Sequence, residues 1–249
     1  AKLNSNVPEE FQNLDRFEAR KLILNKLDEM NLLIKEEKQQ MVIPYGDRSV
    51  VVIEPWLTDQ WFCDAKKLSV DPVTAVRDNS SNFIPKQWEN TFYNWMENIQ
   101  PWCISRQLWW GHQIPAWYSP DNKYFVSETL EGAQNQAKEF YGKDVELRQD
   151  EDVLDTWFSS ALWTFSTLDW PNKTYELDKF YPGNVLVTGF DIIFFWVARM
   201  MMMGSYFMKE TPFKDIYIHP LIRDEKGQKM SKSKGNIIDP LELLDKYGA

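Results

Sequence analysis

Two short apolar runs near the carboxyl end of the chain flank a longer one. Residues 184–188 (NVLVT) and 215–219 (DIYIH) are rich in β-branched and aromatic residues, which favours short strands. The run 192–208 between them is apolar almost throughout, but it is shorter than the roughly 20 residues of a membrane span and holds Arg199 near its middle. We therefore expect a buried helix, and strand, glycine turn, helix and strand together predict an α/β fold with a parallel sheet.

Residues 1–53 are predicted to form a unit of their own. A capping pattern at 15–18 (DRFE) precedes apolar residues that follow at roughly helical spacing as far as Met30, and this predicts a helix. A turn at 45–48 (YGDR) then leads into 50–53 (VVVI). We expect this last run to be a short buried strand.

Tryptophan and proline become frequent from Glu54 onward. Residues 71–100 are predicted to be helical with interruptions at Pro72 and Pro85. In the run 102–118 (WCISRQLWWGHQIPAWY), aromatic rings beside arginine and histidine could stack on RNA bases, but rings at this density more often belong to a core, and we expect them to pack. The polar stretch at about 119–147 is predicted to be a surface insertion.

The composition favours a folded protein with reduced thiols. Hydrophobic residues make up 43% and charged residues 26%, which suits a packed core rather than disorder. The net charge of −9 argues against a dedicated basic nucleic-acid-binding domain. The two cysteines, Cys63 and Cys103, lie far apart and suggest reduced cytosolic thiols, so we place the protein in the cytoplasm.

A lysine-rich loop follows the predicted strand at 215–219. Lys226, Lys229, Lys232 and Lys234 lie between that strand and a helix start at 239–242 (DPLE). Open α/β sheets bind ligands beyond the carboxyl ends of their strands, and flexible ammonium groups there suit a polyphosphate. On charge alone, a solvated lysine loop is the alternative.

The run 229–233 (KMSKS) resembles the ATP-binding loop of the class I aminoacyl-tRNA synthetases. The resemblance implies that Lys229 and Lys232 are the catalytic residues and phosphate ligands, and that Met230, Ser231 and Ser233 complete the ATP-binding loop. The run 189–191 (GFD) is weak evidence for nucleotide binding when taken alone, because Asp191 could merely cap a helix. In the context of the loop, it resembles the nucleotide-binding element of the same family. Gly189 would approach the adenosine, and Asp191 would accept the ribose hydroxyls of an ATP that brings its own Mg²⁺.

Three further runs are more similar to the members of this class that handle valine than to those for isoleucine or leucine. They are 108–112 (LWWGH), 115–118 (PAWY) and 149–163 (QDEDVLDTWFSSALW). The resemblance implies that Trp157, Ile192 and Trp196 wall a valine pocket. The last two are one helical turn apart. The carboxylates of 149–155 could hold a divalent cation, although helix caps and solvated turns are commoner explanations.

The resemblance covers essentially the whole chain. It implies that residues 54–249 are the second half of a Rossmann-like catalytic domain with its connecting modules, and that residues 1–53 are the carboxyl-terminal remnant of an inserted editing domain. The family's His-x-Gly-His motif and its anticodon-binding helices are absent. We therefore expect an internal piece that lacks amino- and carboxyl-terminal parts of the parent synthetase.

The implied reaction joins valine and ATP into valyl-adenylate and transfers valine to tRNA(Val). Valine, ATP and tRNA(Val) are the expected partners, with no membrane. No structural zinc is expected, because the Cys-x-x-Cys ribbon of many relatives is absent from this sequence. We therefore predict no metal site. The piece alone is expected to be inactive. The alternatives are a fragment of an isoleucine enzyme and a catalytically silent binding module.

Overall fold

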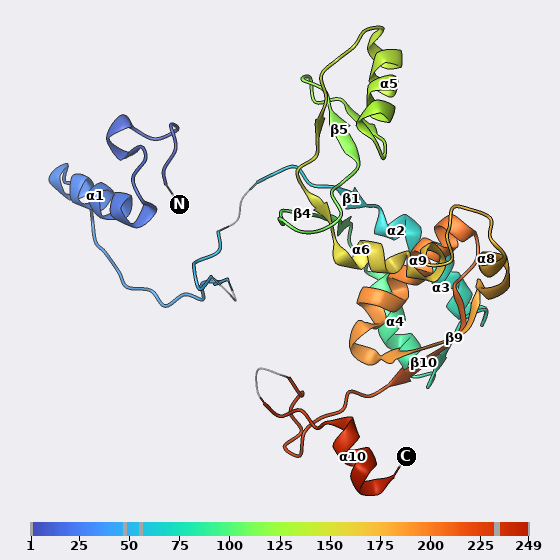
Figure 1. Cartoon of the computed structure of the whole chain (residues 1–249). Coiled ribbons are helices and arrows are strands. Elements are labelled where there is room, and N and C mark those ends of the chain that lie inside the picture. Colours follow the sequence, from blue (N-terminus) through green and yellow to red (C-terminus); the bar gives the residue numbers. More distant parts are fainter. Residues whose placement is uncertain (1, 47–48, 55–56, 232–234, 249) are drawn as a thin grey trace. The chain divides into compact units, whose positions relative to one another are not determined.

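The computed structural model describes residues 2–46, 49–54, 57–231 and 235–248. The chain divides into two units, residues 1–58 and 59–249 (Figure 1). The division falls in the segment that follows the boundary expected from the sequence at 53/54.

The first unit is built around helix α1 (Arg16–Glu29), which follows a 3-10 turn (Glu9–Phe11). Asp15 Oδ1 accepts a hydrogen bond of 2.9 Å from the backbone N–H of Phe17, so the predicted amino-terminal cap is confirmed. The predicted buried strand at 50–53 is wrong. Val50, Val51 and Ile53 are all more than half exposed, because the described part of this unit offers them no apolar face to pack against. Residues 47–48 of the predicted turn lie outside the described residues.

The second unit contains the remaining helices and strands. In chain order these are β1 (Phe62–Cys63), α2 (Ala65–Leu68), α3 (Val70–Arg77), β2 (Asn82–Ile84), α4 (Trp88–Glu97), β3 (Trp102–Cys103), β4 (Ser105–Arg106), β5 (Ala116–Tyr118), β6 (Tyr124–Val126), α5 (Leu130–Tyr141), β7 (Arg148–Gln149), β8 (Val153–Leu154), α6 (Thr156–Ala161), α7 (Trp163–Ser166), α8 (Tyr175–Phe180), β9 (Gly183–Gly189), a 3-10 turn (Phe190–Ile192), a π-helical turn (Ile193–Ala198), α9 (Arg199–Met208), β10 (Phe213–His219) and α10 (Pro240–Tyr247).

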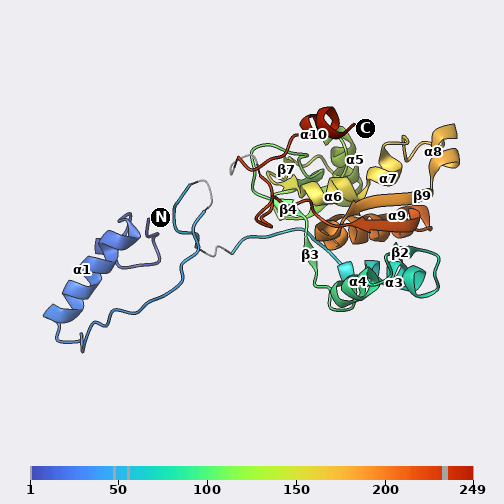
Figure 2. The same ribbon diagram turned by 90° about the horizontal axis from the view of Figure 1, so that it is seen from below.

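A parallel three-stranded sheet in the order β2-β10-β9 organises this unit. The two predicted strands are confirmed as β9 and β10, which pair in parallel from Phe213↔Gly183 to His219↔Gly189. Their connection passes through α9, so the predicted crossover is present (Figure 1 and Figure 2). Side chains alternate along each strand, and one face of the sheet is buried while the other is exposed.

The core lies between the buried face of the sheet and α9. Met200, Met201, Met202 and Met203 are buried completely or almost so, and they belong to the same cluster as Ile216 of β10. One helical run of the described chain, Phe190–Met208, is apolar and long enough to cross a membrane by composition alone. Its burial in this cluster confirms the expected core helix.

The stretch 71–100 is only partly helical. Pro72 lies in the first turn of α3, where its missing N–H has no intrahelical acceptor to lose, so it does not interrupt the helix. The prediction that the stretch between Pro72 and Pro85 is helical is wrong at its end, because residues 82–84 form β2 and pair with β10. α4 follows and ends at Glu97.

The predicted surface insertion folds into a small module of its own (Figure 1). Strands β6, β5 and β7 form an antiparallel sheet, and α5 covers it with a local core of Phe125, Ala133 and Ala137. Ser119 Oγ and its backbone close the expected turn by bonding to Asp121 and Lys123. The polar stretch therefore forms an ordered module and not only a surface loop.

The expectation that the aromatic run 102–118 packs is only half right. Trp102 is buried and Trp117 is half-buried, but Trp109 is fully exposed and Trp110 is 92% exposed. Both indoles lie on the loop between β4 and β5 and meet no core face. Their exposure leaves stacking on RNA bases open as the alternative for this pair.

Candidate active site

The carboxyl ends of β9 and β10 meet at one edge of the sheet, at Gly189 and His219. A Cβ on Gly189 would lie 2.8 Å from Asp191 Oδ1 and 3.7 Å from the His219 ring. The φ angle of Gly189 is −74°, which any residue can adopt, so the requirement is for close approach and not for an unusual backbone. A side chain at position 189 would displace the Asp191 carboxylate.

The structure brings two sequence-predicted residues together at this edge. Asp191 lies in the 3-10 turn after β9, and its Oδ2 is 3.9 Å from the Lys229 ammonium. The lysine side chain is 71% exposed and the aspartate side chain 36% exposed. An ion pair with such a long distance and such solvent exposure contributes little stability. Either group can therefore exchange its partner for a ligand.

Lys229 is held on a hairpin-like loop whose supports the sequence reasoning missed. Asp224 Oδ1 accepts hydrogen bonds from the backbone N–H groups of Lys226 (3.0 Å) and Gln228 (2.7 Å). Gly227 follows in the left-handed region with φ +72°, and its N–H bonds to the Asp224 carbonyl. The pattern Asp-x-x-Gly was the available signal for this turn.

Asn236 ties the two sides of the loop. Its Nδ2 donates to Asp224 Oδ2 at 2.7 Å, and its Oδ1 accepts from the backbone N–H of Ser231 at 2.9 Å. Met230 and Ser231 are partly buried on this loop. Lys232 and Ser233, both assigned to ATP from the sequence, lie outside the described residues.

His219 is a residue of this edge to which the sequence assigned no role. Its Nδ1 lies 2.9 Å from the Pro220 carbonyl oxygen. The exposed ring closes one side of the space left open by Gly189.

The three residues assigned to the amino-acid pocket are all half-buried. Trp157 lies on α6, with its ring 5.9 Å from that of Phe195, and the ring of Trp196 lies 6.1 Å from that of Trp163. Ile192 closes the 3-10 turn, and Trp196 lies in the π-helical turn that follows. The assumed regular helix from Ile192 to Trp196 is therefore wrong, since the backbone changes hydrogen-bonding pattern between them; π-turns of this kind often occur at functional sites.

A buried ion cluster links α6 to α9. Asp155 is 6% exposed, and its Oδ2 accepts from Trp102 Nε1 at 3.0 Å and lies 3.2 Å from Arg106 and 3.5 Å from Arg199. Its Oδ1 also caps α6 at the N–H of Trp157, 3.4 Å away. Burial lowers the pKa of Arg199, whose guanidinium stacks 4.0 Å from the centre of the Trp102 ring. Asp155 therefore positions Trp157 relative to the helical segment that carries Trp196.

The other carboxylates of 149–155 also bind protein donors. Asp150 accepts hydrogen bonds from Trp61 Nε1 at 2.8 Å and from the Tyr118 hydroxyl at 3.0 Å. Burial, followed by this contact with Asp150, raises the pKa of Tyr118 to about 12. The caps and turns expected here are thus present, and among the described residues no three His, Cys, Asp or Glu side chains gather closely enough to hold a metal ion.

The fold is an α/β domain with a parallel sheet, and comparisons with known proteins agree with that class. Residues 9–249 match the family of "tRNA synthetases class I (I, L, M and V)". The chain belongs to this family. Methionyl-tRNA synthetase from Mycobacterium tuberculosis, solved with methionyl-adenylate, shares the fold with a TM-score of 0.54 at 20% identity, over 81% of this chain and 33% of that one.

Relatives that resemble the chain strongly in sequence include valine–tRNA ligases. The protein from Pelagibacter ubique (strain HTCC1062) is 60% identical over 100% of this chain and 28% of its own length. Those of Nitrobacter winogradskyi and Caulobacter vibrioides are each 59% identical, over 98% and 100% of this chain and 28% and 27% of their own lengths. The chain thus spans little more than a quarter of the length of these relatives.

Proposed function

We propose that the chain is part of a valine–tRNA ligase, the part that holds the ATP phosphates and ribose and walls the valine side chain. The observation that carries the proposal is the meeting of Gly189, Asp191 and Lys229 at the carboxyl edge of the parallel sheet. The three relatives named above supply the choice of valine, and none of them favours the isoleucine alternative.

In the proposed reaction a carboxylate oxygen of valine attacks the α-phosphorus of ATP, and pyrophosphate leaves. Negative charge then grows on the departing phosphates. Lys229, together with Lys232, would stabilise that charge, and Met230, Ser231 and Ser233 would complete the loop around the phosphates. Mg²⁺ would arrive with the ATP. Catalysis of this kind needs positioning and charge stabilisation, and no side chain has to form a covalent bond.

The amino-acid and nucleotide subsites would lie on the two sides of the turn 189–192. Asp191 would accept the ribose hydroxyls through the carboxylate that now faces Lys229. Trp157, Ile192 and Trp196 would enclose the isopropyl group. Valine would then be transferred to tRNA(Val), a reaction that we place in the cytoplasm.

The proposal keeps the two parts assigned from the sequence, an editing remnant at 1–53 and a catalytic half at 54–249. Apolar side chains of the first unit, such as Leu32, Ile34 and Val42, are at least 60% exposed. Such exposure suits a segment whose core is completed by further protein.

The test is valine-dependent exchange of pyrophosphate into ATP by a full-length synthetase that carries this sequence, with Asp191→Asn beside the control Asp178→Asn. Asp178 is an exposed aspartate at the start of α8. We expect exchange with valine but not with isoleucine, and a loss of about tenfold or more in kcat/KM for ATP only in the Asp191 variant, as the loss of one charge-assisted hydrogen bond would produce. Absence of valine-dependent exchange would favour a silent binding module.

The 249-residue chain alone is expected to fall below a typical synthetase rate of about 1 per second. ATP would be held from one side only, because the His-x-Gly-His motif is absent from the sequence. Exchange by the chain alone at the full rate would contradict this part of the proposal.

A further inference from the structure

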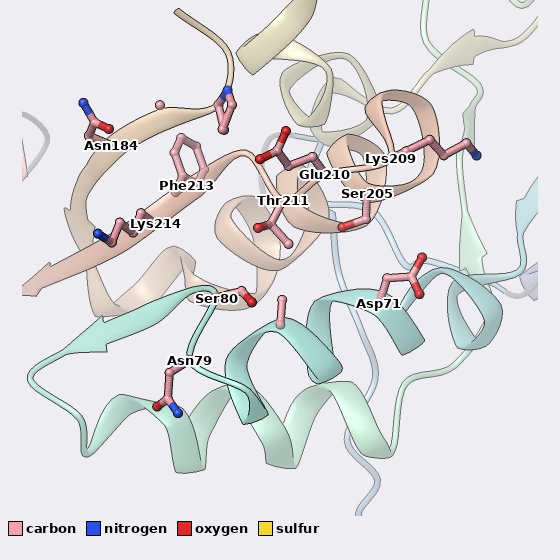
Figure 3. A pocket seen from close by; sticks show the side chains of 13 residues that line it. Asp71, Asn79, Ser80, Asn184, Ser205, Lys209, Glu210, Thr211, Phe213 and Lys214 are labelled. Atoms are coloured by element: carbon pink, nitrogen blue, oxygen red, sulfur yellow. The ribbon is translucent and has the colours of Figure 1, made fainter.

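Two large cavities of the second unit share no residue with the candidate active site. The first has a volume of about 610 Å³ and lies where β9 and β10 begin, at the paired residues Gly183 and Phe213 (Figure 3). Its charged side chains Asp71 and Lys214 lie at opposite ends, so they do not converge on one small ligand (Figure 3). The second has a volume of about 690 Å³ and lies between α4, β3 and the helical segment 194–202. In this second cavity, the polar and aromatic groups do converge.

A buried arginine lines the second cavity. The side chain of Arg199 is 9% exposed. Its hydrogen bonding within the described residues is limited to one long contact of 3.5 Å, from Nη1 to Asp155 Oδ2. Nε and Nη2 have no such partner, yet they are not among the buried polar atoms that solvent cannot reach. Because a guanidinium carries several N–H donors, most of its hydrogen-bonding capacity is left for a group that enters the cavity.

The cavity carries an excess of positive charge. Of the described residues that line it, the charged ones are Arg106 and Arg199. Both depend on the same oxygen, Asp155 Oδ2, which lies 3.2 Å from Arg106 and 3.5 Å from Arg199. Two guanidinium groups therefore share one carboxylate, and one positive charge is left without a counter-ion. A monovalent anion would balance it, and a carboxylate fits the planar fork of an arginine with both of its oxygens.

Aromatic side chains surround the Arg199 guanidinium. Its Cζ lies 4.0 Å from the centre of the Trp102 ring and 5.6 Å from the centre of the Phe194 ring. The Phe194 ring in turn stacks on Trp95, with ring centres 4.7 Å apart and an angle of 24° between the planes. Trp95 is half exposed, so part of its indole is open to a ligand. A ligand that meets both the guanidinium and these rings joins an anionic group to a flat apolar body.

The rim of the cavity is uncharged. Asn94, Asn98 and Gln100 line it and are exposed. Asn98 Nδ2 and Gln100 Nε2 donate to the backbone carbonyls of Asn94 and Asn98, at 3.0 and 3.2 Å. Glu97, on the same helix, pairs with Arg77 at 2.6 Å and does not line the cavity. No carboxylate of the described lining therefore repels an anion, and the volume lies in the range of small-molecule sites, roughly 300–1,000 Å³.

We propose that this cavity is a binding site for a small aromatic carboxylate. The carboxylate accepts hydrogen bonds from Nε and Nη2 of Arg199, and the aromatic ring rests against Trp95 and Phe194. Asp155 keeps its contact with Nη1, so binding leaves the cap of α6 in place. The inference does not depend on the proposed ligase activity, because no residue assigned to ATP or to valine lines the cavity.

The first experiment titrates four small probes into the ¹⁵N-labelled chain and follows their binding by NMR. Phenylacetate carries both the carboxylate and the ring, phenylacetamide only the ring, acetate only the carboxylate, and phenyl phosphate a doubly charged group. We expect phenylacetate to shift the side-chain N–H signals of Arg199 and Trp95. Phenylacetamide and acetate should bind about tenfold more weakly or worse, which corresponds to about 1.4 kcal/mol. Phenyl phosphate should also bind more weakly, because its second charge finds no counter-ion.

The outcomes that overturn the proposal follow from the same series. Equal binding of phenylacetate and phenylacetamide would mean that the Arg199 guanidinium does not bind the ligand. Acetate that binds as tightly as phenylacetate would mean that the rings contribute nothing. Preference for phenyl phosphate would make the cavity a phosphate site instead.

Three variants locate the site. Arg199→Lys keeps the charge but loses the planar fork, and Trp95→Leu removes the half-exposed indole, so each should weaken phenylacetate about threefold or more. Trp109→Leu, at a fully exposed tryptophan between β4 and β5, should change nothing. If Arg199→Lys melts well below the parent chain, Trp95→Leu alone decides. Unchanged affinity in Trp95→Leu, an equal loss in Trp109→Leu, or no binding of phenylacetate by the parent chain refutes the proposal.

Discussion

The Lys229 ammonium lies 3.9 Å from the Asp191 carboxylate, so the lysine loop reaches the turn that follows β9. The pair joins the turn after β9 and the lysine loop. In the sequence, only the resemblance to the class I synthetases linked these two segments. Because it is long and exposed, it holds the loop weakly and leaves both groups available to a nucleotide.

Lys229→Ala in a full-length synthetase carrying this sequence should slow valine activation. The ammonium would act where charge grows on the leaving pyrophosphate, so the loss falls on kcat, by roughly 2–4 kcal/mol of transition-state stabilisation. The measurement is pre-steady-state formation of valyl-adenylate. Lys226→Ala is the matched control, since that lysine lies on the same loop and contributes its backbone N–H to Asp224. If both variants slow the step equally, the loop acts only through its total charge.

Trp196→Leu in a full-length synthetase that carries this sequence should relax the proposed selectivity for valine over isoleucine. A smaller wall admits one more methylene, which is worth about 1–3 kcal/mol, and valine loses affinity through the cavity left behind. The ratio of kcat/KM for isoleucine to that for valine is the measurement. Trp95→Leu controls for loss of an indole, because Trp95 is half exposed and stacks on Phe194 at 4.7 Å. An unchanged ratio would make Trp196 an ordinary packing residue.

Asp155→Ala should destabilise the second unit by about 3–5 kcal/mol, because it leaves the buried Arg199 without its counter-ion. At roughly 2–4 °C per kcal/mol for a chain of this size, the melting temperature should fall by at least 6 °C. Glu151→Ala is the control: its carboxylate is 83% exposed, pairs with Arg148 and should shift stability by less than about 0.5 kcal/mol. Equal small effects of both changes would show that Asp155 contributes only a cap.

Tyr118 should titrate well above an ordinary tyrosine. Its folded pKa of about 12 exceeds the ordinary value of 10.0, so the native state keeps the proton longer, and the stability from this group is complete below pH 10 and lost as the pH rises towards 12. The absorbance difference at 295 nm between the parent chain and Tyr118→Phe should therefore appear near pH 12. A difference centred near pH 10 would mean that the burial of Tyr118 and its contact with Asp150 do not persist in solution.

Local patterns predicted the elements whose determinants are local. The β-branched runs became β9 and β10, and Asp15 became the cap of α1, since a strand or a cap needs only a few neighbouring residues. The short strand β2 was missed because its three residues become a strand only by pairing with β10, which lies far away in the sequence.

Burial was harder to predict than secondary structure. Val50 and Trp109 are strongly apolar but exposed, because hydrophobicity says nothing about whether a partner surface is near. In the candidate active site, Gly189 and Lys229 were assigned from the resemblance of their motifs. The supports were not visible in advance, because the contacts of Asp155 with Arg106 and Arg199 and of Asn236 with Asp224 depend on the folded chain.

The exposed face of the parallel sheet has a consequence for handling the chain. Val185, Val187, Tyr217 and Ile84 project from the same side of β9, β10 and β2, and each is more than 40% exposed. Parallel sheets are almost always covered on both faces, so this apolar surface will drive self-association. The chain should therefore be more prone to precipitate in kosmotropic salts such as sulfate, which strengthen hydrophobic contacts, than in dilute buffer, where its net charge of −9 keeps the molecules apart.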